Sequence, residues 1–160
     1  MKLSTQVDIR ADCDTVFAAA TDFRRLERQA FRRGVEVQRL DRLEGTRAGM
    51  RWSLRFAFRG KSRQLQAEID RCLVPKLLSF RAIAGDGIEV GVSVVLLALA
   101  PSTTRLTVAL DMLPRTLPAR LLIQSLVSSR GALERKLSES VAAFGRKVEA
   151  DRNPEVRLAP

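Results

Sequence analysis

The chain has 160 residues, of which 46% are hydrophobic and 29% charged, and its formal net charge is +10. This length and balance suit one globular domain and exclude a membrane-spanning chain, because no apolar run approaches the roughly 20 residues of a membrane helix. Two cysteines are too few for a disulfide framework, and the first residues lack the apolar stretch of a signal peptide, so we expect a cytoplasmic protein with free thiols.

The N-terminal part predicts one strand followed by two short helices. Residues 3–9 alternate between apolar and polar side chains, which is typical of a half-buried strand. Asp12 is a suitable capping residue for a short helix over 13–20. A second short helix is predicted over about 24–32, and it ends at Gly34, a residue that favours helix termination.

Two predicted strands follow the helices. Residues 35–43 form a strand whose apolar positions change parity after Val37, which predicts a β-bulge near Gln38 and Arg39. Residues 50–59 give the clearest alternation in the chain. Its large apolar side chains share one face: Met50, Trp52, Leu54, Phe56 and Phe58.

Two hairpins continue the predicted sheet. Gly60-Lys61 reads as a two-residue type II′ loop, which sets Arg51 across from Asp70. The same register gives three apolar pairs: Phe56 with Leu65, Leu54 with Ala67, and Trp52 with Ile69. A three-residue loop over 85–87 then joins strands 78–84 and 88–98 and pairs Phe80 with Val92.

The last predicted elements are a strand over 105–112 and one long helix from Pro118 to about Glu149. The connections within residues 50–112 are too short for parallel crossovers, so the sheet must be antiparallel. We predict an α+β helix-grip fold over residues 1–150, in which a curved sheet of six or seven strands, with two short helices, wraps around the long C-terminal helix. Residues 151–160 are expected to form a flexible tail.

Three segments resemble the START-like superfamily, also called SRPBCC, polyketide cyclase/dehydrase-like or Bet v 1-like. The first is the stretch Ala-Asp-Cys-Asp-Thr-Val-Phe-Ala-Ala-Ala-Thr-Asp-Phe at 11–23. The others are Gly45 and Gly49 before a Trp- and Phe-rich strand, and the amphipathic last helix. The resemblance covers residues 2–149. It implies a cavity between sheet and helix that takes lipids, sterols, polyketides or quinones.

The inward apolar side chains are the candidate lining of that cavity, and small ones such as Ala67 and Ala82 leave volume beside the large ones. The alternative is a core packed without a void. The candidate ligand-cavity residues are Trp52, Leu54, Phe56, Phe58, Ala67, Ile69, Phe80, Ala82, Val92, Leu96, Val108, Leu110, Leu126 and Leu133.

The sequence offers no catalytic or metal-binding constellation. It contains no His and no Tyr. The resemblance implies that some enzymatic members of the superfamily place these two residue types in the cavity. Cys13 and Cys72 have no His as a partner, and a zinc site or a cysteine nucleophile would need further ligands or a base. We therefore predict a binding or transport protein for a hydrophobic small molecule, without metal or cofactor. A polyketide cyclase or dehydratase-type enzyme remains the first alternative.

Arginines dominate the positive charge, and four of them, Arg24, Arg25, Arg28 and Arg32, lie in the second predicted helix. They form a candidate docking face for an anionic membrane or an acidic partner, which gives a third hypothesis, an interaction module. The competing interpretation is an arginine-rich surface that is simply solvated. We expect no binding to nucleic acid, because the outward face lacks aromatic side chains on which bases stack.

Overall fold

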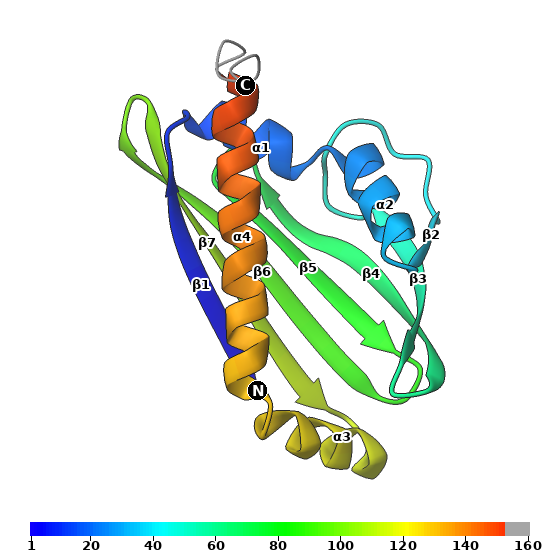
Figure 1. Ribbon diagram of the computed structural model, residues 1–160. Coiled ribbons are helices and arrows are strands. Elements are labelled where there is room, and N and C mark those ends of the chain that lie inside the picture. Colours follow the sequence, from blue (N-terminus) through cyan, green and yellow to red (C-terminus); the bar gives the residue numbers. More distant parts are fainter. Residues whose placement is uncertain (153–160) are drawn as a thin grey trace.

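The protein is a curved antiparallel sheet with helices on one face (Figure 1). A computed structural model describes residues 1–152. The sheet order is β1-β7-β6-β5-β4-β3-β2. The strands are β1 (Lys2–Ile9), β2 (Glu36–Arg39), β3 (Arg51–Phe58), β4 (Lys61–Leu73), β5 (Leu77–Ala84), β6 (Ile88–Ala100) and β7 (Thr103–Pro114). The helices are α1 (Cys13–Ala20), α2 (Phe23–Arg32), α3 (Leu117–Val127) and α4 (Arg130–Arg152). The predicted helix-grip class is confirmed.

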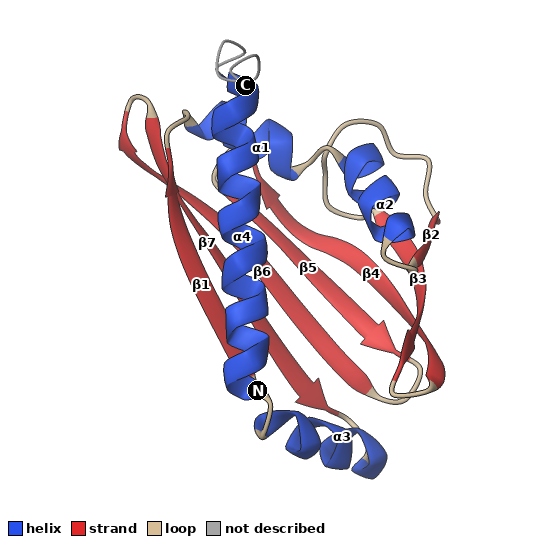
Figure 2. Cartoon of the chain, viewed as in Figure 1, coloured by secondary structure: helices blue, strands red, loops and turns tan. Residues whose placement is uncertain are grey.

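The main core lies between α4 and the part of the sheet around β1. Gly145 of α4 lets the helix approach β1 closely, because a Cβ added there would lie 3.2 Å from Ile9 Cγ1. Val141 and Val148 occupy the same buried cluster as Ile9 and Ile69, and Ile69 is fully buried. Consequently α4 covers the β1 side of the sheet, whereas α2 lies over the β2–β3 side (Figure 2).

The predicted long helix is two helices. α3 ends at Val127, and α4 begins at Arg130. Only α4 of these two helices runs along the length of the sheet (Figure 1). Ser128 and Ser129 separate them: the Ser128 hydroxyl donates to the Ser125 carbonyl at 2.9 Å, and the Ser129 carbonyl accepts from Leu133 N at 3.0 Å. Adjacent serines weaken a helix through such local bonds, and the apolar stripe alone could not reveal the break.

The predicted register of the β3–β4 hairpin is wrong by two residues. The loop is Arg59-Gly60, with φ of 52° and 72°, which is the geometry of a type I′ turn rather than a type II′ turn. Trp52 therefore faces Ala67, and Arg51 faces Glu68. A shift of two residues preserves which face each side chain occupies, so the predicted inward set is unchanged.

The predicted bulge in the strand after α2 is also absent. β2 ends at Arg39. After it the chain leaves the ladder, and the Asp41 carboxylate accepts hydrogen bonds from Leu43 N and Arg51 N. The irregular positions lie instead in β4, between Ile69 and Arg71, and in the β6–β7 pair.

The predicted β5–β6 hairpin is confirmed, since Phe80 pairs with Val92 and Gly87 adopts φ of 92° in the loop. At the C-terminus, α4 continues to Arg152, so residues 151 and 152 of the expected tail are helical, and residues 153–160 lie outside the described part. Within residues 1–152, no helix combines the length and the apolar character that a membrane span requires.

Candidate functional site

An apolar groove lies between α2 and the concave face of the sheet. Its volume is about 390 Å³, and its wall is almost entirely hydrocarbon. Strands β2 to β6 form the floor, and one side of α2 forms the rim. The lining residues are Phe23, Leu26, Glu27, Ala30, Val37, Trp52, Leu54, Leu65, Ala67, Phe80, Ala82, Val90 and Val92.

The structure gathers six of the predicted cavity residues around this groove: Trp52, Leu54, Ala67, Phe80, Ala82 and Val92. The others lie elsewhere. Ile69 and Leu96 are packed in the main core, against which Val108 also packs, and Leu126 is buried in α3. The remaining ones, Phe56, Phe58, Leu110 and Leu133, are only partly buried and do not line the groove.

Sequence reasoning missed the α2 side of the groove. Phe23, Leu26 and Ala30 recur at three- and four-residue steps, which is the spacing of one helix face. The sequence thus contains this apolar pattern, within a helix whose other positions are mostly arginines. The groove therefore lies under α2, whereas the resemblance had pointed to a cavity under the last helix.

An aromatic cluster forms one end of the groove. The Trp52 ring lies 4.9 Å from the Phe23 ring and 6.1 Å from the Phe80 ring, centre to centre, in tilted arrangements. The Arg39 guanidinium carbon lies 5.2 Å from the centre of the Trp52 ring. With 5% of its surface exposed, Trp52 is held in one orientation and presents a rigid apolar surface to the groove.

One polar side chain interrupts the hydrocarbon wall. Trp52 Nε1 donates a hydrogen bond to Glu27 Oε1 at 3.0 Å, which links α2 to β3 across the groove rim. Glu27 is the single ionisable residue among the lining residues of the groove. The site can therefore hold an apolar molecule by burial and can orient a hydroxyl or amine on it through the carboxylate.

No protein family model matches the chain, and no curated protein matches it in sequence. Solved structures do match. TTHA0849 from Thermus thermophilus gives a TM-score of 0.67 at 19% identity, covering 94% of this chain and 99% of that one. The Zhui aromatase/cyclase from Streptomyces sp. R1128 gives 0.65 at 15% identity, covering 94% of both chains. A START superfamily protein from Mycobacterium smegmatis gives 0.53 at 17%, covering 84% and 95%.

This chain has the START-like fold. The resemblance stated from the sequence is thereby confirmed at the level of the fold. In this START-like chain the groove is open along α2, because α3 turns away from the axis of α4 at Ser128 and leaves the β3–β6 floor uncovered by the last helix (Figure 2).

A partly buried ion pair supports the Trp52 end of the groove. Asp41 accepts from Arg39 Nε at 2.7 Å and Nη2 at 2.9 Å, and from the backbone N–H groups of Leu43 and Arg51. The Arg39 hydrogen bonds, helped by these two N–H groups, hold the pKa of the Asp41 carboxyl well below its usual range. Arg39 is thereby fixed beside Trp52.

Replacing this carboxylate is expected to change the acid stability of the protein. The folded-state pKa of Asp41 lies below its unfolded value, so its contribution is present above about pH 4 and is lost as the pH falls further. Asp41→Asn should lower the free energy of unfolding at pH 7 by about 1–3 kcal/mol and flatten its decline below pH 4. Urea unfolding between pH 2 and pH 7 measures both effects. If the free energy of unfolding fell in parallel with pH for the parent and for Asp41→Asn, this role of Asp41 would be contradicted.

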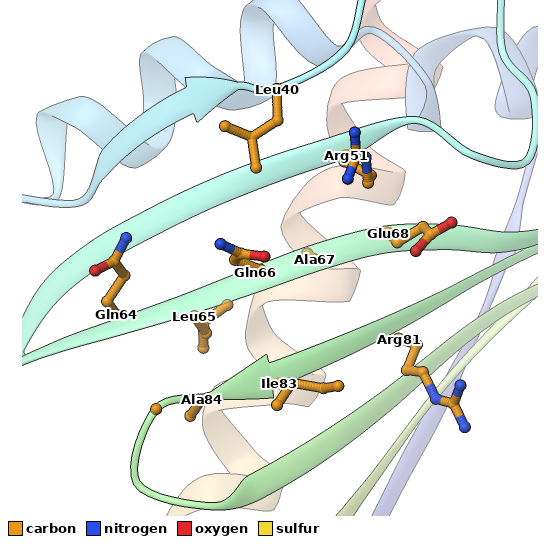
Figure 3. A pocket seen from close by; sticks show the side chains of 11 residues that line it. Leu40, Arg51, Gln64, Leu65, Gln66, Ala67, Glu68, Arg81, Ile83 and Ala84 are labelled. Atoms are coloured by element: carbon orange, nitrogen blue, oxygen red, sulfur yellow. The ribbon is translucent and has the colours of Figure 1, made fainter.

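Figure 3 shows a second hollow, on the face of the sheet that points away from α4. Its volume is about 440 Å³, and its lining includes the polar side chains Arg51, Gln64, Gln66, Glu68 and Arg81. These side chains alternate along their strands with those that face the groove, so the two hollows lie on opposite faces of one sheet. Because its polar walls are open to solvent, this hollow does not suit an apolar ligand.

The predicted basic face lies on the outer side of α2. Arg24, Arg28 and Arg32 surround Phe31, whose side chain is 74% exposed, in a shallow hollow that also reaches Glu27. Arg25 lies apart from them, since its guanidinium is 3.8 Å from the Asp151 carboxylate of α4. Three of the four predicted arginines thus share one surface, and its docking role stays a prediction.

Proposed function

We propose that this START-like protein binds and carries a hydrophobic small molecule in the groove between α2 and the sheet. The observation behind the proposal is a groove of about 390 Å³ whose wall is almost wholly hydrocarbon. Pockets of roughly 300–1,000 Å³ with apolar walls and few polar groups are typical of small-molecule sites. The similar fold of START superfamily proteins supports the same class of function.

The aromatic cluster and Glu27 narrow the class of ligand. Three tilted rings, of Phe23, Trp52 and Phe80, offer broad flat surfaces, which favour a ligand with fused or planar rings or an extended hydrocarbon. Glu27 keeps a second carboxylate oxygen beside the one that Trp52 engages, and it favours a ligand with one hydroxyl or amine donor. A ligand of this kind would be oriented by a single polar contact.

An enzymatic role has less support in this groove. One similar structure is an aromatase/cyclase, and such chemistry needs groups that move protons. Among the described residues that line the groove, Glu27 is the one ionisable side chain, so no second group stands beside it to share a proton transfer. The two thiols, Cys13 and Cys72, are free and lie outside the groove, and burial raises the pKa of Cys72, which keeps it in the unreactive thiol form. Both free thiols fit a cytoplasmic carrier.

Native mass spectrometry of the purified protein tests this proposal. We expect the native mass to exceed the denatured mass by a few hundred daltons in part of the sample, because an apolar ligand in an apolar groove is retained through purification. Loading the ligand-free fraction with the neutral probe N-phenyl-1-naphthylamine should add one probe per chain. A native mass equal to that of the bare chain under both conditions would overturn the proposal.

A further inference from the structure

The most exposed apolar helix of the protein is α3, which lies at the end of β7 away from α1 (Figure 1). Its inner side is seated on the fold, since Ala119, Ile123 and Leu126 are buried. Its outer side also carries large apolar side chains, beside the polar Arg120 and Gln124: Leu117 is 67% exposed and Leu121 is 59% exposed. A surface helix normally places polar residues outward, so these exposed leucines call for a partner.

Contacts at both ends fix α3 in this orientation. Thr116 caps the helix by accepting from Ala119 N at 3.2 Å, and its hydroxyl donates to the Asp86 carbonyl at 2.9 Å. Near the other end, Arg59 of the β3–β4 turn donates to the Ser125 hydroxyl at 2.6 Å. The outer leucines are therefore held in solvent by a helix that is already anchored.

Cations predominate around this helix, because the acidic side chains near its first turn, Asp86 and Glu89, are paired with Arg63 and Arg115. No acidic residue occurs from 112 to 133, and none occurs from 45 to 67, the segment that includes the β3–β4 turn. Arg120 lies on the outer side of α3 between Leu117 and Leu121, and the β3–β4 turn brings Arg59 and Lys61 alongside. Exposed leucines and cations thus share this end of the molecule.

We propose that this surface, formed by Leu117, Leu121, Arg120, Arg59 and Lys61, docks the protein on an anionic lipid bilayer. Apolar side chains that enter the headgroup region and cations that face lipid phosphates are the two contributions that interfacial helices combine. A second copy of the chain fits less well, because each copy carries a net charge of +10 and would bring the same cations to the contact.

The α2 face is the weaker of the two candidate docking surfaces. It supplies cations but only one strongly exposed apolar side chain, Phe31. Salt screens the attraction between cations and anionic lipids, and this surface has little apolar area to bury in the bilayer instead. The α3 surface supplies both contributions. Docking through the α3 surface does not require a ligand in the groove.

Flotation with vesicles tests the proposal, using phosphatidylcholine alone or with 30% phosphatidylserine, at 10 mM and 150 mM salt. We expect the full chain to float with the anionic vesicles at both salt concentrations, more weakly at 150 mM, and not with the neutral ones. The double variant Leu117→Gln/Leu121→Gln should bind at least about tenfold more weakly at both. Circular dichroism and thermal unfolding should match the parent, since both side chains are exposed.

A matched variant on α2, Arg24→Gln/Arg28→Gln, serves as the control. We expect it to keep most of the binding at 150 mM salt. Loss of flotation in the α2 variant with retention in the α3 variant would overturn the proposal, as would an absence of anionic-vesicle binding by the parent. Sedimentation without vesicles completes the test: a dimeric parent that becomes monomeric in the α3 variant would assign the surface to self-association and would equally overturn it.

Discussion

Ala67→Phe is expected to weaken the binding of N-phenyl-1-naphthylamine at least tenfold. Ala67 faces Trp52 across the β3–β4 ladder and lines the middle of the groove floor, so a phenyl ring at this position would fill space that the ligand needs. Because the new ring enters an open groove, thermal stability should change little. Fluorescence titration of the probe, together with the thermal midpoint of each variant, measures both effects.

Ala57→Phe is the matched control for this substitution. Ala57 lies on the same hairpin, pairs with Ser62 and is exposed outside the groove. It should leave probe affinity unchanged. Equal loss of affinity in the two variants would indicate that the probe binds somewhere other than the groove between α2 and the sheet.

Ile69→Ala is expected to give the largest loss of stability among single core substitutions, about 2–5 kcal/mol. Ile69 is fully buried at the point where the core under α4 meets the floor of the groove, and it lies just before the irregularity in β4. Truncation would leave a cavity that the rigid ladder on both sides cannot close. Urea unfolding monitored by circular dichroism gives the free energy of unfolding.

Arg55→Ala provides the comparison, since Arg55 is an exposed residue of β3 on the face opposite the groove. A surface change of this kind alters stability by less than about 0.5 kcal/mol. Similar urea midpoints for the two variants would mean that the assigned facing of the β3 and β4 side chains is wrong.

Much of the fold was predictable from sequence because alternation fixes which face a strand side chain occupies. Trp52, Leu54 and Phe80 point inward as the pattern indicated, even though the β3–β4 register was displaced by two residues. That displacement depends on Arg59, which adopts positive φ in a type I′ turn. Such a conformation is uncommon for arginine, and no local pattern identifies it.

The site was harder to predict because it depends on how the helices are placed. An apolar stripe predicts that a helix is amphipathic, but it does not show whether the helix bends at Ser128 or which part of the sheet it covers. Similarly, no local pattern in the arginine-rich second helix distinguishes Glu27. Only its hydrogen bond to Trp52, which lies 25 positions away in the chain, places it at the groove rim.

An apolar ligand is expected to occupy the groove beside Trp52, the only tryptophan of the chain. Fluorescence of this residue with 10-bromo-1-decanol and with 1-decanol tests it most directly, because bromine quenches indole only at short range. We expect saturable quenching by the brominated alcohol, displaceable by 1-decanol and strongly reduced in Ala67→Phe. Binding of both alcohols without quenching of Trp52, or no binding by the folded protein, would contradict the account.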